Sequence, residues 1–139
     1  MNRDMTEIIR NQSPVCLGPE ATLRQACATM HDKRIGAILV TDPGGRLVGI
    51  ATGRDIVRCV GAGMDLGTTT LDQVMTRAPE TMPPRSTAIE ALRLMRDGGF
   101  RHVPIVEHGR PVGIVSRGDF RGLEHDRLDA ETGLWERIG

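Results

Sequence analysis

Two short segments of this chain carry side chains that could hold a ligand at the start of a helix. In the first, Thr52 and Asp55 follow a short apolar run, and in the second, Ser116 and Asp119 follow a matching run. A hydroxyl followed three positions later by an acid is typical of a helix N-cap. The same residues can also bind a ligand, because a helix N-terminus attracts phosphate and an ionised carboxylate accepts hydrogen bonds from both hydroxyls of a ribose. Both interpretations are open from these residues alone.

The two segments belong to a longer internal duplication. Residues 49–55 (GIATGRD) return as residues 113–119 (GIVSRGD), an offset of 119 − 55 = 64, and residues 22–26 return as residues 87–91, an offset of 87 − 22 = 65. The one-residue difference falls in a turn at residues 42–45. A duplication of this length indicates two copies of one structural unit. Since each copy spans only about 60 residues, which is marginal for independent stability, we expect the copies to pack against each other.

Each copy contains an amphipathic helix upstream of its motif. Apolar residues recur at positions i, i+3, i+4 and i+7, which predicts one buried stripe on each helix: Leu23, Ala26, Cys27 and Met30, and then Ala88, Ala91, Leu92 and Met95. Each helix begins at a capping box, Thr22-x-x-Gln25 or Thr87-x-x-Glu90.

Two strands and a second helix follow in each copy. β-Branched residues on either side of a glycine-containing turn predict hairpins, one from residues 35–40 and 47–51 and one from residues 100–106 and 112–115. Pro104 within a strand predicts a sheet edge or a position where the ladder opens. With a short strand before the first helix, each copy has the order strand, helix, strand, strand, helix. Gly49 and Gly113, just before the motifs, allow a ligand or another backbone to approach closely.

The composition argues against several classes of function. The 139 residues carry 18 basic and 18 acidic side chains and only two Phe and one Trp, so we expect neither a nucleic-acid partner nor a membrane partner. The three cysteines form no CxxC pair, which favours a cytoplasmic location. We expect neither a membrane span nor a signal peptide. No His or Cys spacing suits a metal ion and no nucleophile–base set is visible, so we expect no metal site and no enzymatic activity.

In this duplicated context the motifs resemble the CBS domain family, named after cystathionine β-synthase. The signature Gly-hydrophobic-x-Thr/Ser-x-x-Asp occurs twice, each time after a predicted hairpin, and residues 101–107 (RHVPIVE) match the family's second-strand pattern. The layout is most similar to stand-alone bacterial proteins that consist of one CBS pair (a Bateman module), including those of the hypoxic-response type.

The resemblance implies an α+β fold of tandem β-α-β-β-α CBS repeats packed with pseudo-twofold symmetry. We expect a first repeat at residues 5–62, a linker at 63–70, a second repeat at 71–124 and a C-terminal helical tail at 125–139.

The resemblance also implies two clefts between the repeats that bind adenosine-containing ligands. By analogy with the family, Asp55 and Asp119 would hold the ribose, and Thr52 and Ser116 would contact the phosphate. The strand starts would surround the adenine through Val15, Gly36, Ala37, Ile38, Thr81, His102, Val103 and Pro104, and the cations near a phosphate would be Arg54, Arg101 and Arg117. No cofactor is required. AMP, ADP or ATP is the expected ligand, and S-adenosylmethionine is a second candidate because it shares the adenosine half.

The two copies differ where their hairpins begin. The second copy has Arg101-His102 where the first has Gly36-Ala37. If a phosphate binds, we expect the second site to prefer it, because charge-assisted hydrogen bonds to phosphate are strong. The open alternative is that Arg101 and His102 form only exposed ion pairs at the strand end.

The sequence therefore predicts a non-enzymatic regulatory module that senses an adenine nucleotide, forms a homodimer and acts on an unknown protein partner. Ligand would favour one mutual orientation of the repeats, to which the partner responds. Leu134, Trp135 and Ile138 in the tail could form a self-association surface or cover their own sheet. The alternative function is a ligand-independent dimeric adaptor, in which the four motif residues act only as helix caps.

Overall fold

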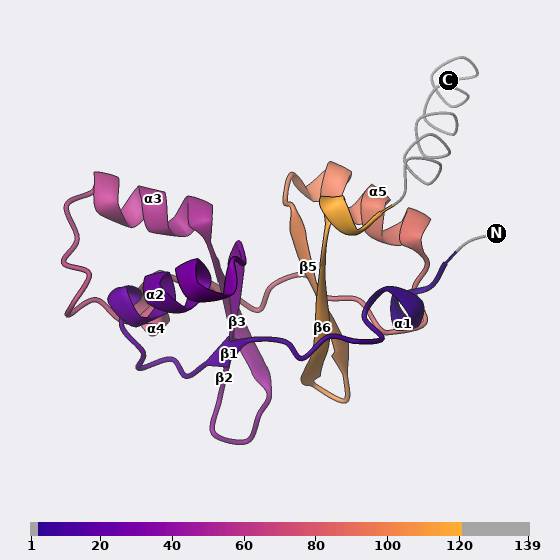
Figure 1. Cartoon of the computed structure of the whole chain (residues 1–139), viewed down its shortest axis with the longest axis horizontal. Coiled ribbons are helices and arrows are strands. Elements are labelled where there is room, and N and C mark those ends of the chain that lie inside the picture. The colour runs from indigo at the N-terminus through magenta and orange to yellow at the C-terminus, as the bar shows by residue number, and fades with distance from the viewer. Residues whose placement is uncertain (1–2, 121–139) are drawn as a thin grey trace, which may run out of the picture. The chain divides into compact units, whose positions relative to one another are not determined.

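The computed structural model describes residues 3–120, and these residues form two compact units (Figure 1). The first-repeat unit contains residues 13–79 and 108–111. The second-repeat unit contains residues 3–12, 80–107 and 112–120 of the described range. The predicted tail at 125–139 lies outside the described residues. No helix within residues 3–120 is long and apolar enough to cross a membrane.

The first-repeat unit is built on a four-stranded sheet in the order β1-β2-β3-β4. Its elements are β1 (Cys16–Leu17), α2 (Leu23–Lys33), β2 (Ala37–Thr41), β3 (Leu47–Thr52), α3 (Gly53–Gly61), α4 (Leu71–Val74) and β4 (Thr76–Arg77). β1 runs parallel to β2, whereas β2 with β3 and β3 with β4 are antiparallel. The predicted hairpin and the predicted order strand, helix, strand, strand, helix are both confirmed.

The second-repeat unit has the same order of one helix followed by two strands, with a smaller sheet. It contains α1 (Met5–Ile8), α5 (Ala88–Gly98), β5 (His102–Glu107), β6 (Arg110–Ser116) from Val112 onward and the 3₁₀ turn η1 (Arg117–Asp119). β5 and β6 form a two-stranded sheet, and Met82 makes a single parallel bridge to Ile105. The predicted helix after Ser116 is described only as far as η1 and Phe120.

Pro104 explains why the second sheet has no full counterpart of β1. In the first-repeat unit, the backbone N–H of Leu39 donates to the Val15 carbonyl at 3.2 Å, beside the β1–β2 pairing. The residue 65 positions after Leu39 is Pro104, which has no N–H to donate. The strand corresponding to β1 is therefore reduced to the Met82 bridge, where the Met82 N–H donates to the Pro104 carbonyl at 3.1 Å. This confirms that the ladder opens at the proline, as predicted.

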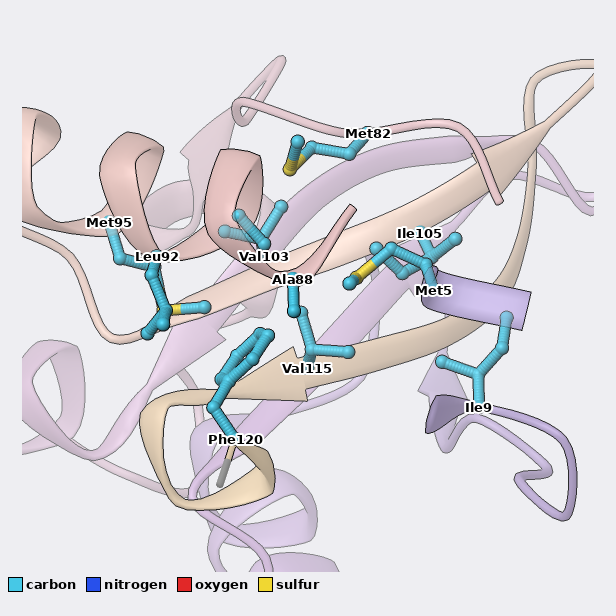
Figure 2. Close-up of a cluster of buried hydrophobic side chains, with 11 residues drawn as sticks. Met5, Ile9, Met82, Ala88, Leu92, Met95, Val103, Ile105, Val115 and Phe120 are labelled. Atoms are coloured by element: carbon cyan, nitrogen blue, oxygen red, sulfur yellow. The ribbon is translucent and has the colours of Figure 1, made fainter. Parts of the chain in front are cut away.

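Each unit has its own hydrophobic core. In the second-repeat unit the predicted stripe Ala88, Ala91, Leu92 and Met95 is fully buried and packs with residues of α1, β5 and β6 (Figure 2). In the first-repeat unit Leu23 and Ala26 are buried, but Cys27 and Met30 are only half-buried. The predicted stripe on α2 is thus confirmed for two of its residues, and the prediction that Cys27 belongs to the core is wrong.

Each core also receives a short segment from the beginning of the other repeat. α1, at the start of the first repeat, lies in the second-repeat unit, where the Met5 N–H donates to the Ser86 carbonyl at 2.8 Å. α4, which follows the predicted linker, lies in the first-repeat unit, where the Leu71 N–H donates to the Ala21 carbonyl at 2.8 Å. These two bonds correspond by the internal repeat, with offsets of 71 − 5 = 66 and 86 − 21 = 65. The compact units therefore cut across the sequence repeats.

The two motif glycines make room for these exchanged segments. A Cβ atom at Gly49 would collide with the Met75 side chain and would lie 3.0 Å from the Thr76 carbonyl oxygen. A Cβ atom at Gly113 would lie 2.6 Å from Ile9 Cγ2. The close approach predicted at both positions is therefore made by the protein itself, after α4 in one unit and after α1 in the other.

Candidate functional site

The first candidate site lies where β3 ends and α3 begins. Ala37, the first residue of β2, pairs with Thr52, and the Gly53 N–H donates to the Gly36 carbonyl at 3.1 Å. The strand pairing thus brings the predicted residues Gly36 and Ala37 beside the Thr52–Asp55 motif.

The Asp55 carboxylate accepts three hydrogen bonds. Its Oδ2 accepts from the Thr52 backbone N–H at 2.9 Å and from the Thr52 hydroxyl at 3.2 Å. Its Oδ1 accepts from Nη2 of Arg58 at 3.3 Å, and the same nitrogen donates to the Val74 carbonyl at 3.2 Å. The Asp55 side chain is only 13% exposed. The predicted helix-capping role of the motif is confirmed here.

The second candidate site lies where β6 ends and η1 begins. Oδ2 of Asp119 accepts from the Ser116 backbone N–H at 2.7 Å and from the Ser116 hydroxyl at 3.3 Å, so this motif also caps its own turn. Asp119 is exposed. Within residues 3–120, no hydrogen bond or ion pair reaches its Oδ1 atom.

His102 lies close enough to Asp119 for the two to interact electrostatically. Burial lowers the pKa of His102; the negative charge of Asp119 partly opposes this shift, and the positive charge of Arg101 adds to it. The structure thus brings His102, Ser116 and Asp119 of the predicted set together. A neutral imidazole at physiological pH can either donate or accept a hydrogen bond.

The remaining predicted residues fall into two groups. Some are buried in the units, namely Ile38, Val103 and Pro104, and others are exposed, namely Arg54, Thr81, Arg101 and Arg117. Val15 is half-buried, and its carbonyl accepts from β2 as described above. Their assignment to a ligand site stays a prediction.

One residue of the site, Arg58, was not among those predicted from the sequence. Arg58 follows Asp55 by three positions on α3, a spacing at which opposite charges on a helix meet. That spacing was visible in the sequence and could have identified the pair. The additional bond to Val74 depends on α4 joining this unit, which no local pattern indicates.

The described residues offer little for metal or thiol chemistry. Residues 3–120 contain no group of three or more His, Cys, Asp or Glu side chains that could hold a metal ion. Burial raises the pKa of the Cys16 thiol, which disfavours the reactive thiolate.

Comparison with known protein families matches residues 5–62 and 71–126 to the CBS domain. Since these two matches cover most of the 139 residues, the chain belongs to the CBS domain family. The tandem α+β architecture predicted from the sequence is confirmed by the fold and by this match.

Curated relatives include long and short proteins. A CBS domain-containing protein of Arabidopsis thaliana (CBSCBSPB2) is 36% identical over 108 residues, which are 77% of this chain and 20% of the relative. The chain thus spans about a fifth of the plant relatives' length. Hypoxic response protein 1 of Mycobacterium tuberculosis is 32% identical over 112 residues, which are 80% of this chain and 78% of the relative.

Solved structures of CBS proteins share the fold. A CBS domain protein from Pyrobaculum aerophilum, complexed with AMP, superposes with a TM-score of 0.84 at 26% sequence identity. The superposition covers 92% of this chain and 99% of that protein.

Proposed function

We propose that this chain is a non-enzymatic regulatory module that binds an adenosine-containing ligand at its two hydroxyl–carboxylate motifs. The observation that carries this proposal is the duplicated placement of Thr52 with Asp55 and of Ser116 with Asp119, each at the end of a strand. Each carboxylate is an acceptor suited to the hydroxyls of a ribose. The AMP complex of the similar Pyrobaculum aerophilum protein supports an adenosine ligand.

The cations near the motifs favour a phosphate-bearing ligand. Arg54, Arg101 and Arg117 are exposed; Arg54 and Arg117 lie within the two motifs, and Arg101 directly precedes β5. AMP, ADP or ATP carries phosphate groups that these side chains can bind, whereas the sulfonium of S-adenosylmethionine carries a positive charge that they repel. We expect the adenine to contact the strand starts near Gly36 and His102. The module needs no bound cofactor for this role.

Ligand binding would act on a second protein by shifting populations. A nucleotide that binds one conformation of the module more tightly raises the share of that conformation, and a partner that prefers it then responds to the nucleotide concentration. Typical coupling free energies of this kind are about 1–3 kcal/mol. We expect a cytoplasmic location for such a sensor.

Self-association is the second part of the proposal. Val57 and Val60 lie three residues apart on α3, Met64 follows the end of this helix, and their exposed fractions are 72%, 55% and 43%. Exposed apolar side chains that lie close together in this way are typical of a surface that packs against another protein. We expect a homodimer in solution, with Val57→Asp shifting it towards the monomer in sedimentation equilibrium.

Calorimetric titration tests the ligand directly. We expect AMP, ADP or ATP to bind the wild type and Asp119→Ala to weaken that binding. If none of these nucleotides nor S-adenosylmethionine binds at millimolar concentration, the proposed ligand class is wrong.

One observation favours the alternative adaptor function. Both carboxylates already cap their own helix or turn, so the motifs have a structural use without any ligand. A ligand at 100 times its Kd stabilises a protein by about 2.7 kcal/mol. Absence of a thermal shift with the adenosine compounds, combined with dimer formation, would favour the adaptor.

A further inference from the structure

The two motif carboxylates differ in how many hydrogen bonds they can still accept. An ionised carboxylate has about four acceptor positions on its two oxygens. Asp55 uses three of them, two for Thr52 and one for Arg58. Asp119 uses two, both for Ser116, and both are on Oδ2. A ribose offers two neighbouring hydroxyl donors, so the described partners of Asp119 leave room for both, whereas those of Asp55 leave room for one.

Arg58 causes this difference. Its Nη2 atom lies 3.3 Å from Oδ1 of Asp55 and 3.2 Å from the Val74 carbonyl oxygen, so it lies between the two acceptors. The position corresponding to Arg58 in the second repeat, 58 + 64 = 122, is Gly122, which has no side chain to donate. In sequence, the two repeats thus differ at the position that supplies the third hydrogen bond to Asp55.

We infer that Arg58 is a specificity-determining residue that competes with the ribose diol for Asp55, so that ligand binds first at Asp119. This inference rests on the proposed function. The competition is weak enough to be overcome, because the Arg58 side chain is 65% exposed and an exposed ion pair of this kind is worth little. Ligand at Asp55 therefore requires Arg58 to release Oδ1, and the first-repeat site fills at higher ligand concentration.

The test isolates the first-repeat site and uses a ligand without phosphate. In an Asp119→Ala background, calorimetric titration with adenosine reports on Asp55 alone. Arg58→Met keeps the aliphatic stem but donates no hydrogen bond, and we expect it to tighten adenosine binding by about two- to fivefold, the range for release of an exposed ion pair. Binding of 2′,3′-dideoxyadenosine, which lacks both hydroxyls, should be unchanged by Arg58→Met.

Controls separate competition from a general effect of charge or folding. Lys33→Met removes an exposed cation from α2 in the same unit and should leave adenosine binding unchanged. Asp119→Asn replaces Asp119→Ala if the latter unfolds, because the amide oxygen still accepts from the Ser116 N–H. Equal or weaker adenosine binding in Arg58→Met would overturn the inference, as would an equal gain for dideoxyadenosine.

The inference and the proposed function fail in different ways. If the wild type binds no adenosine compound, both are wrong. The outcome differs if the wild type binds adenosine through Asp119. If adding Arg58→Met to the Asp119→Ala protein then leaves its adenosine binding, or its failure to bind, unchanged, only the role of Arg58 is wrong.

Discussion

Among residues 3–120, the Asp55 carboxylate accepts three hydrogen bonds and the Asp119 carboxylate accepts two, although each acid follows the end of a corresponding strand. The bonds that they share come from the hydroxyl residue three positions earlier, which closes the start of the helix or turn. The third bond to Asp55 comes from Arg58, which follows this acid by three residues in the sequence. The cap is thus common to both copies, whereas Arg58, which we infer to compete with the ligand, belongs to the first copy.

A second difference between the units has a similar origin. Leu39 donates a backbone hydrogen bond beside β1, and the corresponding Pro104 cannot. One substitution therefore reduces a paired strand to a single bridge, while the core beneath it stays intact, since Val103 and Ile105 on either side are fully buried. Duplicated units tolerate such local losses where hydrophobic burial supplies the stability.

The largest effect expected from a substitution concerns the exchanged segments. Met5 and Leu71 occupy corresponding positions, and both side chains are completely buried. Truncating such a residue leaves a cavity, so we expect Met5→Ala and Leu71→Ala each to lower the free energy of unfolding by about 2–5 kcal/mol. Urea denaturation measures this change.

Lys33→Ala provides the control, because Lys33 is exposed on α2 and should change stability little. A Met5→Ala protein as stable as Lys33→Ala would mean that α1 does not belong to the second core. The exchange of segments would then hold in one direction only.

The next largest effect concerns the two motif glycines. We expect Gly49→Ala to destabilise by about 1–3 kcal/mol, because the added methyl group meets the Thr76 backbone oxygen as well as Met75. Gly113→Ala should cost at least as much, because the added methyl group would lie 2.7 Å from Ile9 Cβ, which the backbone holds in place, and 3.0 Å from the Gln12 Oε1 atom that accepts from the Ile114 N–H. Thermal unfolding of both variants tests this order.

Gly53→Ala serves as the reference for the glycine pair, because a Cβ atom there meets nothing within 4 Å and alanine favours the helix. Equal stability of the Gly49→Ala and Gly53→Ala proteins would contradict the close packing after α4.

The sequence predicts those parts of the fold that depend on local spacing. The apolar stripes and capping boxes locate α2 and α5, and the β-branched runs locate the hairpins, because each signal lies within a few residues. The exchange of α1 and α4 was not predictable, since four-residue helices carry no pattern that selects one core over the other. β4 was missed for the same reason, because Thr76 and Arg77 form a strand only through pairing with β3.

The same distinction applies to the candidate site. The bonds of Thr52 to Asp55 and of Ser116 to Asp119 span three residues and follow from capping rules. The proximity of His102 to Asp119 depends instead on the folding of β5 and β6 beside each other, so the sequence suggested both residues without showing that they interact.

The two motif acids should rank differently in stability and in ligand binding, and this effect is smaller than the two above. Substituting Asp55 should cost more stability, whereas substituting Asp119 should cost more binding. Asp55→Ala removes three hydrogen bonds from a largely buried carboxylate, and we expect it to lower stability by about 1–2 kcal/mol. Asp119→Ala removes two from an exposed carboxylate and should cost about 0.5–1 kcal/mol. Nucleotide binding should follow the opposite order, with the larger loss for Asp119→Ala. Thermal unfolding and calorimetry on the same samples test both orders, and identical losses of binding would contradict the inequality of the sites.

The smallest expected effect is a dependence of stability on pH that comes from His102 of the second-repeat unit, a position at which the first-repeat unit has Ala37. Burial lowers the pKa of His102 in the folded protein below its ordinary value of 6.5. As the pH falls through about 6.5, His102 therefore takes up a proton in the unfolded chain before it does so in the folded protein. The free energy of unfolding then declines until the pH passes below the lowered pKa. Urea denaturation between pH 7.5 and about pH 5 should show this decline in the wild type, and His102→Gln should reduce it. Asp119→Asn should make the decline steeper, because the negative charge of Asp119 favours protonated His102. A decline of the same size in wild type and His102→Gln would mean that His102 does not titrate differently on folding.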